Sequence, residues 1–201
     1  MSVVIIATGT ANTASVLAAF SKLGVTPTLS SDPEVVLQAT HVVLPGVGAF
    51  AAAMQALRKS GLDRAICQRV KDHKPLLGIC LGLQLLCEGS AESPGEKGLG
   101  IIPATIARLP GGANLRVPHM GWNQVKAEQK CRLLASGVAY FANSYCLLNR
   151  TAGFDCAVTS YGVEFVSGVE RGSLVALQCH PELSGDYGQK TLKRWLEESL
   201  C

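Results

Sequence analysis

The sequence predicts an α/β protein with a doubly wound, mostly parallel sheet flanked by helices. In the first half of the chain, short apolar runs alternate with helical patterns, as in consecutive βαβ units. In the second half, shorter apolar runs are separated by turn signals such as Pro110-Gly111-Gly112 and Tyr161-Gly162. These signals predict antiparallel strands added at one side of the sheet.

The composition is that of one globular domain over residues 1–201. Of the 201 residues, 48% are hydrophobic and 16% are charged, which argues against a disordered chain. The net charge is only +3 and dense lysine or arginine runs are lacking, so we expect no nucleic-acid partner. The apolar runs are too short to cross a membrane, and no basic segment precedes the first run as in a signal peptide. We therefore expect a cytoplasmic protein with no membrane contact.

The first half predicts four strands, and helices connect them. Apolar runs place the strands at 3–6, 25–30, 41–44 and 76–79. The first helix is expected over 14–23. A second, short helix starts with Asp32 as its N-cap and Pro33 in its first turn. The third covers 51–57, and the pattern allows an extension to 70 with a break near Gly61.

The second half predicts shorter strands after a polar loop at 90–100. These strands are expected at 101–109, 117–125, 139–147, 156–160, 163–168 and 174–179. An amphipathic helix over 190–200 closes the chain. Parallel sheets bind ligands beyond the carboxyl ends of their strands, so the loops after Leu44 and Ile79 can face one site.

The segment Gly78-Ile79-Cys80-Leu81-Gly82 joins a buried strand to a helix. It has the form of a nucleophile elbow with cysteine in place of serine. The glycines allow a tight turn, and the positive end of the following helix favours the thiolate of Cys80. The alternative is that Cys80 is simply a small buried apolar residue.

A second chemical motif is His180-Pro181-Glu182, at the end of an apolar strand. Pro181 stops further pairing, so His180 can leave the sheet edge, and Glu182 at the alternate position can orient its ring. Together with Cys80, these residues make a nucleophile, a base and a group that orients the base. On its own, a histidine before proline is more often a turn residue.

The loop Pro45-Gly46-Val47-Gly48 has three interpretations. Its glycines can leave backbone N–H groups free to bind an oxyanion formed at Cys80, with the N–H of Leu81 as the second donor. It also matches the dinucleotide fingerprint loosely, but on the third strand and without a clear ribose-binding acid. A plain tight turn is the third interpretation.

The remaining cysteines and aromatic residues predict structure more than chemistry. The eight cysteines include no C-x-x-C pair, which argues against a zinc site and a thioredoxin-like site, and we expect reduced thiols. Cys87 and Cys179 are expected in the core. Trp122 is expected to be a packed aromatic residue, and His119 to be structural or interfacial.

The three motifs resemble the class I, triad-type glutamine amidotransferases. The segments His119-Met120-Gly121-Trp122-Asn123 and 140–145, and the opening Thr8-Gly9-x-x-Asn12, narrow the resemblance to the glutaminase subunits of imidazole glycerol phosphate synthase. The order and spacing of the motifs are similar from end to end. The resemblance implies a flavodoxin-like α/β fold and a role in histidine biosynthesis.

By this resemblance, Cys80 attacks the carboxamide of glutamine, His180 passes the proton to the departing ammonia, and Glu182 orients His180. Val47 and Leu81 donate backbone N–H groups to the oxyanion. The substrate-binding residues would be Gly46, Gly48, Gln84, Glu92, Ser144 and Tyr145. The implied partner is a (β/α)₈-barrel cyclase that forms a heterodimer with the glutaminase and receives its ammonia. The resemblance implies no metal and no organic cofactor.

Three positions depart from the family pattern: Asn143 stands where histidine is usual, Leu183 where lysine or arginine is usual, and Ala7 where aspartate is frequent. They affect the expected strength of partner docking. A paralogous amidotransferase feeding another acceptor, such as an amino-sugar pathway, remains an alternative. So does a regulatory subunit with weakened catalysis. A flavodoxin-like cysteine hydrolase is disfavoured because such proteins often place histidine where Leu81 follows the cysteine.

Overall fold

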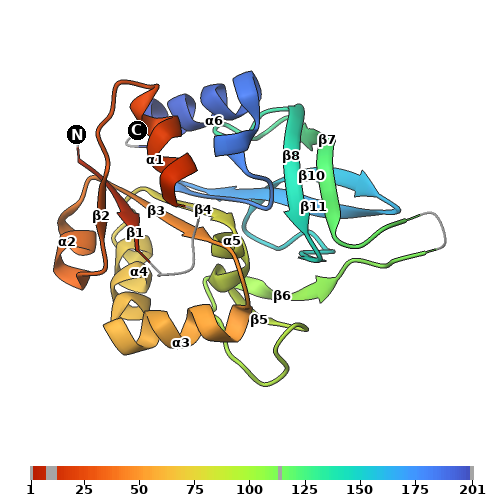
Figure 1. Ribbon diagram of the computed structural model, residues 1–201, viewed down its shortest axis with the longest axis horizontal. Helices are drawn as coiled ribbons and strands as arrows, with labels where there is room; N and C mark the ends of the chain where they lie inside the picture. The colour runs from red at the N-terminus through yellow and green to blue at the C-terminus, as the bar shows by residue number, and fades with distance from the viewer. Residues whose placement is uncertain (1, 8–12, 113–114, 200–201) are drawn as a thin grey trace.

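The computed structural model describes residues 2–7, 13–112 and 115–199, and these residues form a nine-stranded sheet with helices on both faces (Figure 1). From one edge to the other, the strands are β2 (Thr28–Ser30), β1 (Val3–Ile6), β3 (His41–Gly46), β4 (Leu76–Cys80), β12 (Leu174–Leu177), β11 (Val163–Arg171), β10 (Asp155–Tyr161), β7 (His119–Ala127) and β8 (Gly137–Asn143). The four pairings among the first five strands are parallel, and every pairing from β12–β11 onward is antiparallel. This confirms the predicted fold class.

Six α-helices within the described residues cover the parallel part of the sheet. They are α1 (Thr13–Ser21), α2 (Pro33–Gln38), α3 (Phe50–Ser60), α4 (Leu62–Lys71), α5 (Leu81–Leu86) and α6 (Gly185–Glu198). Helices α1 and α6 pack on one face and α2 to α5 on the other (Figure 1). None of these helices combines the length and the apolar run that a membrane crossing needs.

Strand β1 shows why this segment is a strand buried on both faces. Val3 and Ile5 belong to the core beneath α1 and α6, whereas Val4 and Ile6 belong to the core on the opposite face. Successive side chains of a strand point to opposite faces, so a continuous apolar run fills both cores.

Two helix boundaries follow the predicted signals. Asp32 Oδ1 accepts a hydrogen bond from the backbone N–H of Glu34 (2.9 Å), so it caps α2 as expected. Gly61 adopts a left-handed conformation, with φ of 75°, and separates α3 from α4 where the break was predicted.

Three expectations about the second half were wrong. The segment 101–109 does not join the large sheet: β6 (Ile102–Arg108) forms a small separate sheet with β5 (Cys87–Ser90) and β9 (Tyr145–Cys146). The predicted strand 139–147 is divided, since β8 ends at Asn143 and β9 belongs to the small sheet. Helix α6 starts at Gly185, five residues before its predicted start. Its first turn contains two glycines, which weaken the sequence signal, but Gly188 is required there because a Cβ atom would clash with the carbonyl oxygen of Pro181.

The sheet register brings the predicted motifs to one place. Gly46 at the end of β3 pairs with Cys80 at the end of β4, and Leu177 at the end of β12 pairs with Ile79. His180 follows Leu177 by three residues. The carboxyl ends of β3, β4 and β12 therefore converge on one edge of the sheet, where parallel sheets bind ligands.

Candidate active site

Cys80 lies at a strained strand-to-helix corner. It is the last residue of β4 and precedes α5, with φ of 54° and ψ of −107°. Positive φ is uncommon for a residue with a side chain, and such strain concentrates at functional positions. Gly82 makes the corner possible, because a Cβ atom there would clash with the carbonyl oxygen of Leu44. The chain has the shape of the predicted elbow.

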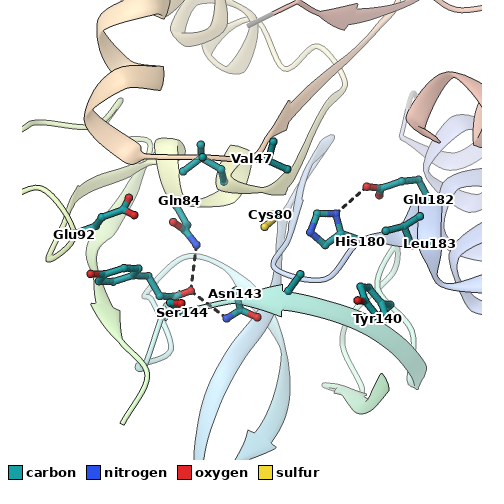
Figure 2. A pocket seen from close by; sticks show the side chains of 14 residues that line it. Val47, Cys80, Gln84, Glu92, Tyr140, Asn143, Ser144, His180, Glu182 and Leu183 are labelled. Carbon is teal, nitrogen blue, oxygen red and sulfur yellow. Dashed lines mark hydrogen bonds and ion pairs between the residues drawn. The ribbon is translucent and has the colours of Figure 1, made fainter. Parts of the chain in front are cut away.

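His180 lies between Cys80 and Glu182 (Figure 2). Its Nδ1 is 2.8 Å from Oε1 of Glu182, and Cys80 lies on the other side of the ring. The backbone N–H of His180 donates to the carbonyl oxygen of Tyr140 (2.9 Å), which fixes the turn after β12. The structure thus brings together the three residues that the sequence nominated as nucleophile, base and orienting acid.

The electrostatics of this group favour a charged imidazole. Burial opposes protonation of His180, but the hydrogen bonds and negative charges of Cys80 and Glu182 outweigh it and raise the pKa of His180 to about 10. At neutral pH the imidazole of His180 is therefore protonated. The arrangement is suited to hold a thiolate beside an imidazolium, which can then donate its proton to a leaving group.

A cavity of about 440 Å³ opens in front of Cys80 (Figure 2). Its lining includes nine of the predicted residues: Val47, Gly48, Cys80, Leu81, Gln84, Ser144, Tyr145, His180 and Glu182. The predicted Glu92 also lines it, and Glu92 Oε2 accepts a hydrogen bond from the backbone N–H of Phe50 (2.7 Å). Gly46 does not line the cavity: it lies behind it, where a Cβ atom would press on the side chain of Leu81.

The predicted oxyanion loop approaches the elbow from β3. Val47 and Gly48 line the cavity opposite the turn, and Gly48 has φ of 98°, which favours glycine. Leu81 is the first residue of α5, where backbone N–H groups have no acceptor within the helix. Both segments are thus placed to present backbone N–H groups toward a ligand at Cys80.

The sequence did not nominate several residues that lie at the cavity. Tyr140, Ala142, Asn143 and Leu183 also line it. Tyr140 and Ala142 alternate on β8, so the period-two pattern of that strand could have placed both on one face. Gln178, a buried residue outside the cavity lining, has its Nε2 3.6 Å from Cys80 Sγ. Its signal was a polar side chain within the otherwise apolar run that leads to His180.

Trp122 is not packed as predicted. It is 58% exposed on β7, the strand next to the sheet edge, and its ring packs edge-on against that of Tyr140. The expectation failed because β7 and β8 form an edge ribbon with one open face. His119, in contrast, is structural as expected: it is buried, and its ring stacks on Phe141 and Tyr161.

The predicted core cysteines are buried. Cys87 and Cys179 are inaccessible to solvent, and burial raises the pKa of both thiols, that of Cys87 to about 12. Seven cysteines fall within the described residues, and each of them is free. The opening motif that includes Asn12 lies outside the described residues.

Comparisons with known proteins show which proteins the chain resembles. The family model for class-I glutamine amidotransferases matches residues 4–198. The "Imidazole glycerol phosphate synthase subunit HisH" of Streptococcus gordonii is 45% identical over 189 residues, 92% of this chain and 91% of that protein. The corresponding HisH of Listeria innocua is 40% identical, covering 97% of this chain and 95% of that protein.

Two further comparisons concern a longer relative and the fold. "Imidazole glycerol phosphate synthase hisHF, chloroplastic" of Arabidopsis thaliana is 38% identical over 96% of this chain, which spans only 33% of that protein. A solved structure described as "Crystal structure of glutamine amidotransferase" superposes with a TM-score of 0.81 over the whole of both chains at 20% identity. At this level of identity the similarity shows a shared fold and nothing more. The chain therefore belongs to the class-I glutamine amidotransferases and, among them, to the HisH subunits of imidazole glycerol phosphate synthase.

Proposed function

We propose that Cys80, His180 and Glu182 carry the glutaminase reaction of this amidotransferase, and that its ammonia passes to a cyclase partner. The observation that carries the proposal is the position of His180, which is hydrogen-bonded to Glu182 and lies beside Cys80 at the wall of one cavity. This is the arrangement that a cysteine nucleophile with an oriented proton carrier requires.

In the first half of the reaction, the thiolate of Cys80 attacks the δ-carbonyl carbon of glutamine, and the carbonyl π electrons move to oxygen. The backbone N–H groups of Val47 and Leu81 stabilise the resulting oxyanion. His180 gives its proton to the amide nitrogen, the C–N bond breaks, and ammonia leaves a γ-glutamyl thioester. Glu182 holds the Nδ1 proton of His180 throughout, so the other ring nitrogen exchanges the proton.

In the second half, neutral His180 takes a proton from water as the water oxygen attacks the thioester carbon. The tetrahedral intermediate collapses to glutamate, and the thiolate of Cys80 leaves with His180 again protonated. The other predicted substrate contacts are Gly46, Gly48, Gln84, Glu92, Ser144 and Tyr145. Glu92 is the natural partner for the α-ammonium group of glutamine, because it is the carboxylate at the cavity that is not already paired with His180.

An apolar rim beside the cavity supports docking of the cyclase. It consists of Met120, Trp122, Val138 and Leu183, which are exposed. Met120 and Trp122 pair in register with Ala142 and Tyr140, which line the cavity, and cross-strand partners share one face. A partner seated on this apolar rim would cover the cavity mouth and receive ammonia without its loss to solvent. The hisHF relative, in which this chain spans one third of the length, agrees with a larger companion domain.

The test compares glutamine-dependent and ammonia-dependent synthesis by the complex of this chain with its cyclase. We expect the isolated chain to hydrolyse glutamine slowly, and the cyclase with its ligand to accelerate it. Cys80→Ala should abolish glutamine-dependent synthesis and leave ammonia-dependent synthesis unchanged. Cys67→Ala, a change on α4 outside the cavity, should leave both unchanged.

An electrophilic glutamine analogue should label Cys80 and thereby identify the nucleophile. Equal loss of ammonia-dependent synthesis in Cys80→Ala would contradict the division of labour between the two subunits. Glutamine hydrolysis that no cyclase accelerates would instead point to a different ammonia acceptor.

A further inference from the structure

Gln178 lies beside the nucleophile but is not part of the cavity lining. Its side chain is completely buried, and its Nε2 lies 3.6 Å from Cys80 Sγ, within hydrogen-bonding distance of sulfur. Its backbone N–H donates to the carbonyl oxygen of Ser167 (2.9 Å), which anchors the segment between β12 and His180. The sulfur therefore has two neighbours that can donate to it, His180 and Gln178.

The orientation of the Gln178 amide follows from its neighbours. The oxygen and nitrogen ends of an amide have nearly the same shape, so the partners must decide which end points where. The backbone carbonyl of Tyr145 can only accept, so Gln84 turns its Nε2 toward it (3.1 Å). The same Nε2 is 3.1 Å from Oε1 of Gln178. Gln178 must then present its oxygen to Gln84 and its N–H group to Cys80.

Asn143 adds a third side-chain amide to the hydrogen-bond network of Gln84 and Gln178. Its Nδ2 donates to the same Tyr145 carbonyl (3.1 Å), so two side chains hold one main-chain oxygen in place (Figure 2). Each link is buried or nearly so, and buried hydrogen bonds are stronger and less adaptable than exposed ones. The carbonyl oxygen of Tyr145, at the break between β8 and β9, thus determines that Gln178 presents its N–H group to the sulfur.

We propose that Gln178 is a further catalytic residue whose side-chain N–H stabilises the thiolate of Cys80. The inference rests on the proposed role of Cys80 as nucleophile. A hydrogen bond to an anion is stronger than one to a neutral group, so this donor favours thiolate over thiol. It acts again when the thiolate leaves the tetrahedral intermediate of thioester hydrolysis, because negative charge returns to the sulfur in that step.

The position of Gln178 separates this role from substrate binding. Gln178 touches the sulfur but is not among the residues that line the cavity. Loss of its N–H should therefore lower kcat and leave KM for glutamine nearly unchanged. A residue that only shaped the pocket would change KM as well.

The test measures alkylation of Cys80 by iodoacetamide in the full-length chain as a function of pH, with mass spectrometry of the Cys80 peptide. In Gln178→Met, the pH of half-maximal alkylation rate should rise by roughly half a unit to one unit. In Gln178→Glu it should rise further, because an acceptor of like charge then faces the sulfur. The control Gln68→Met, on the exposed face of α4, should not shift it.

Other titratable groups around Cys80 are the same in every variant. They are His180 and Glu182 in the turn after β12, Cys179 beside them, Glu92 after β5, Tyr140 on β8 and Tyr145 on β9. A shift confined to the Gln178 variants is therefore due to the amide. In the complex, Gln178→Met should lower kcat about tenfold with KM within about twofold.

An unchanged alkylation profile in folded Gln178→Met and Gln178→Glu would overturn the proposal. If thermal melting shows that neither variant folds, Gln84→Met is the test. It leaves Gln178 in place but removes the hydrogen bond that orients the Gln178 amide. We expect a smaller rise in the pH of half-maximal alkylation. An unchanged alkylation profile in Gln84→Met would also overturn the proposal. Alkylation does not require turnover, so absence of glutaminase activity in the wild-type complex would refute the proposed function separately.

Discussion

The Nδ1 atom of His180 lies 2.8 Å from Oε1 of Glu182, and both side chains are almost completely shielded from solvent, with 8% and 5% of their areas exposed. A carboxylate in this position acts on the ring both through its charge and through its hydrogen bond to Nδ1. It sets which nitrogen keeps its proton and favours the imidazolium form.

Glu182→Gln tests this influence. Glutamine can retain a hydrogen bond but carries no charge, so burial should then lower the pKa of His180 from its raised value of about 10. In the proposed mechanism, protonated His180 is needed for ammonia to leave. The alkaline limb of the kcat/KM profile should therefore move to lower pH, and kcat should fall by roughly 10²-fold or more. Glutaminase assays of the complex from pH 6 to 10 measure both; Asp186→Asn, an exposed acid in α6, is the control. An unshifted limb would contradict the assigned role.

Gly82→Ala should displace the elbow. A Cβ atom at this position would clash with the carbonyl oxygen of Leu44, and backbone on both sides leaves little room to relax. We expect a loss of about 2 kcal/mol in unfolding free energy and a marked loss of glutaminase activity. Urea unfolding gives the stability. Gly112→Ala, where a Cβ atom meets nothing within 4 Å, should change neither quantity, and an equal effect of the two substitutions would rule out the clash.

The parts of the site that local patterns describe could be predicted from the sequence. Cys80 lies between an apolar run and a helix start, and His180 ends an apolar strand before a proline, so strand ends alone bring them to one edge. The strands and helices of the doubly wound first half could be predicted from the sequence equally well. Strand β5 was missed because Cys87-Glu88-Gly89-Ser90 has neither alternation nor an apolar run, and it forms only by pairing with β6.

Contacts that depend on distant backbone atoms could not be predicted in this way. Gln178 was missed as a neighbour of Cys80 because its orientation is decided by the carbonyl of Tyr145, 33 positions earlier in the chain. Periodicity gives a residue its face but not its hydrogen-bond partner. The error over Trp122 has a similar cause, since its exposure depends on β7 and β8 lying at the sheet edge.

Arg69→Met should destabilise the fold strongly. The guanidinium of Arg69 is completely buried and donates to the backbone carbonyls of Val36, Ala39 and Pro75 at 2.7–2.8 Å, and to that of Thr40 at 3.2 Å. Methionine fills the space but donates to none of these carbonyls, of which that of Pro75 keeps the backbone N–H of Val42 (3.2 Å). A loss of about 3 kcal/mol or more in unfolding free energy is expected in urea titrations. Arg64→Met, exposed on the same helix, should change stability by less than about 0.5 kcal/mol. Similar losses in both variants would refute the role of the buried acceptors.

His41 should make the fold sensitive to acid. It is completely buried against Trp195, with Nε2 3.2 Å from Ser199 Oγ, and burial lowers its pKa to about 4. The unfolded chain binds this proton near pH 6.5, so the stability contribution is present above that pH and is lost as pH falls toward 4. Between pH 7 and 5 it amounts to about 2 kcal/mol.

His41→Gln should remove this part of the pH dependence, although it lowers stability at neutral pH. Urea unfolding at pH 7 and pH 5 gives the difference for each protein. His73→Asn, an exposed site whose left-handed backbone suits asparagine, should keep the wild-type slope. An unchanged slope in His41→Gln would show that another group dominates the acid response.

Trp122→Ala should separate partner binding from folding. The Trp122 side chain is 58% exposed and belongs to the apolar rim that flanks the cavity, so its removal should change unfolding free energy by less than about 1 kcal/mol. Exposed tryptophans at the centre of an interface carry much of its binding energy, so the affinity for the cyclase should fall roughly 30-fold or more by calorimetry. Leu29→Ala is the matched control, because Leu29 is also exposed but lies on β2, at the opposite edge of the sheet (Figure 1). If Leu29→Ala weakened binding and Trp122→Ala did not, the cyclase would dock at the far edge, too remote to receive ammonia from Cys80 directly.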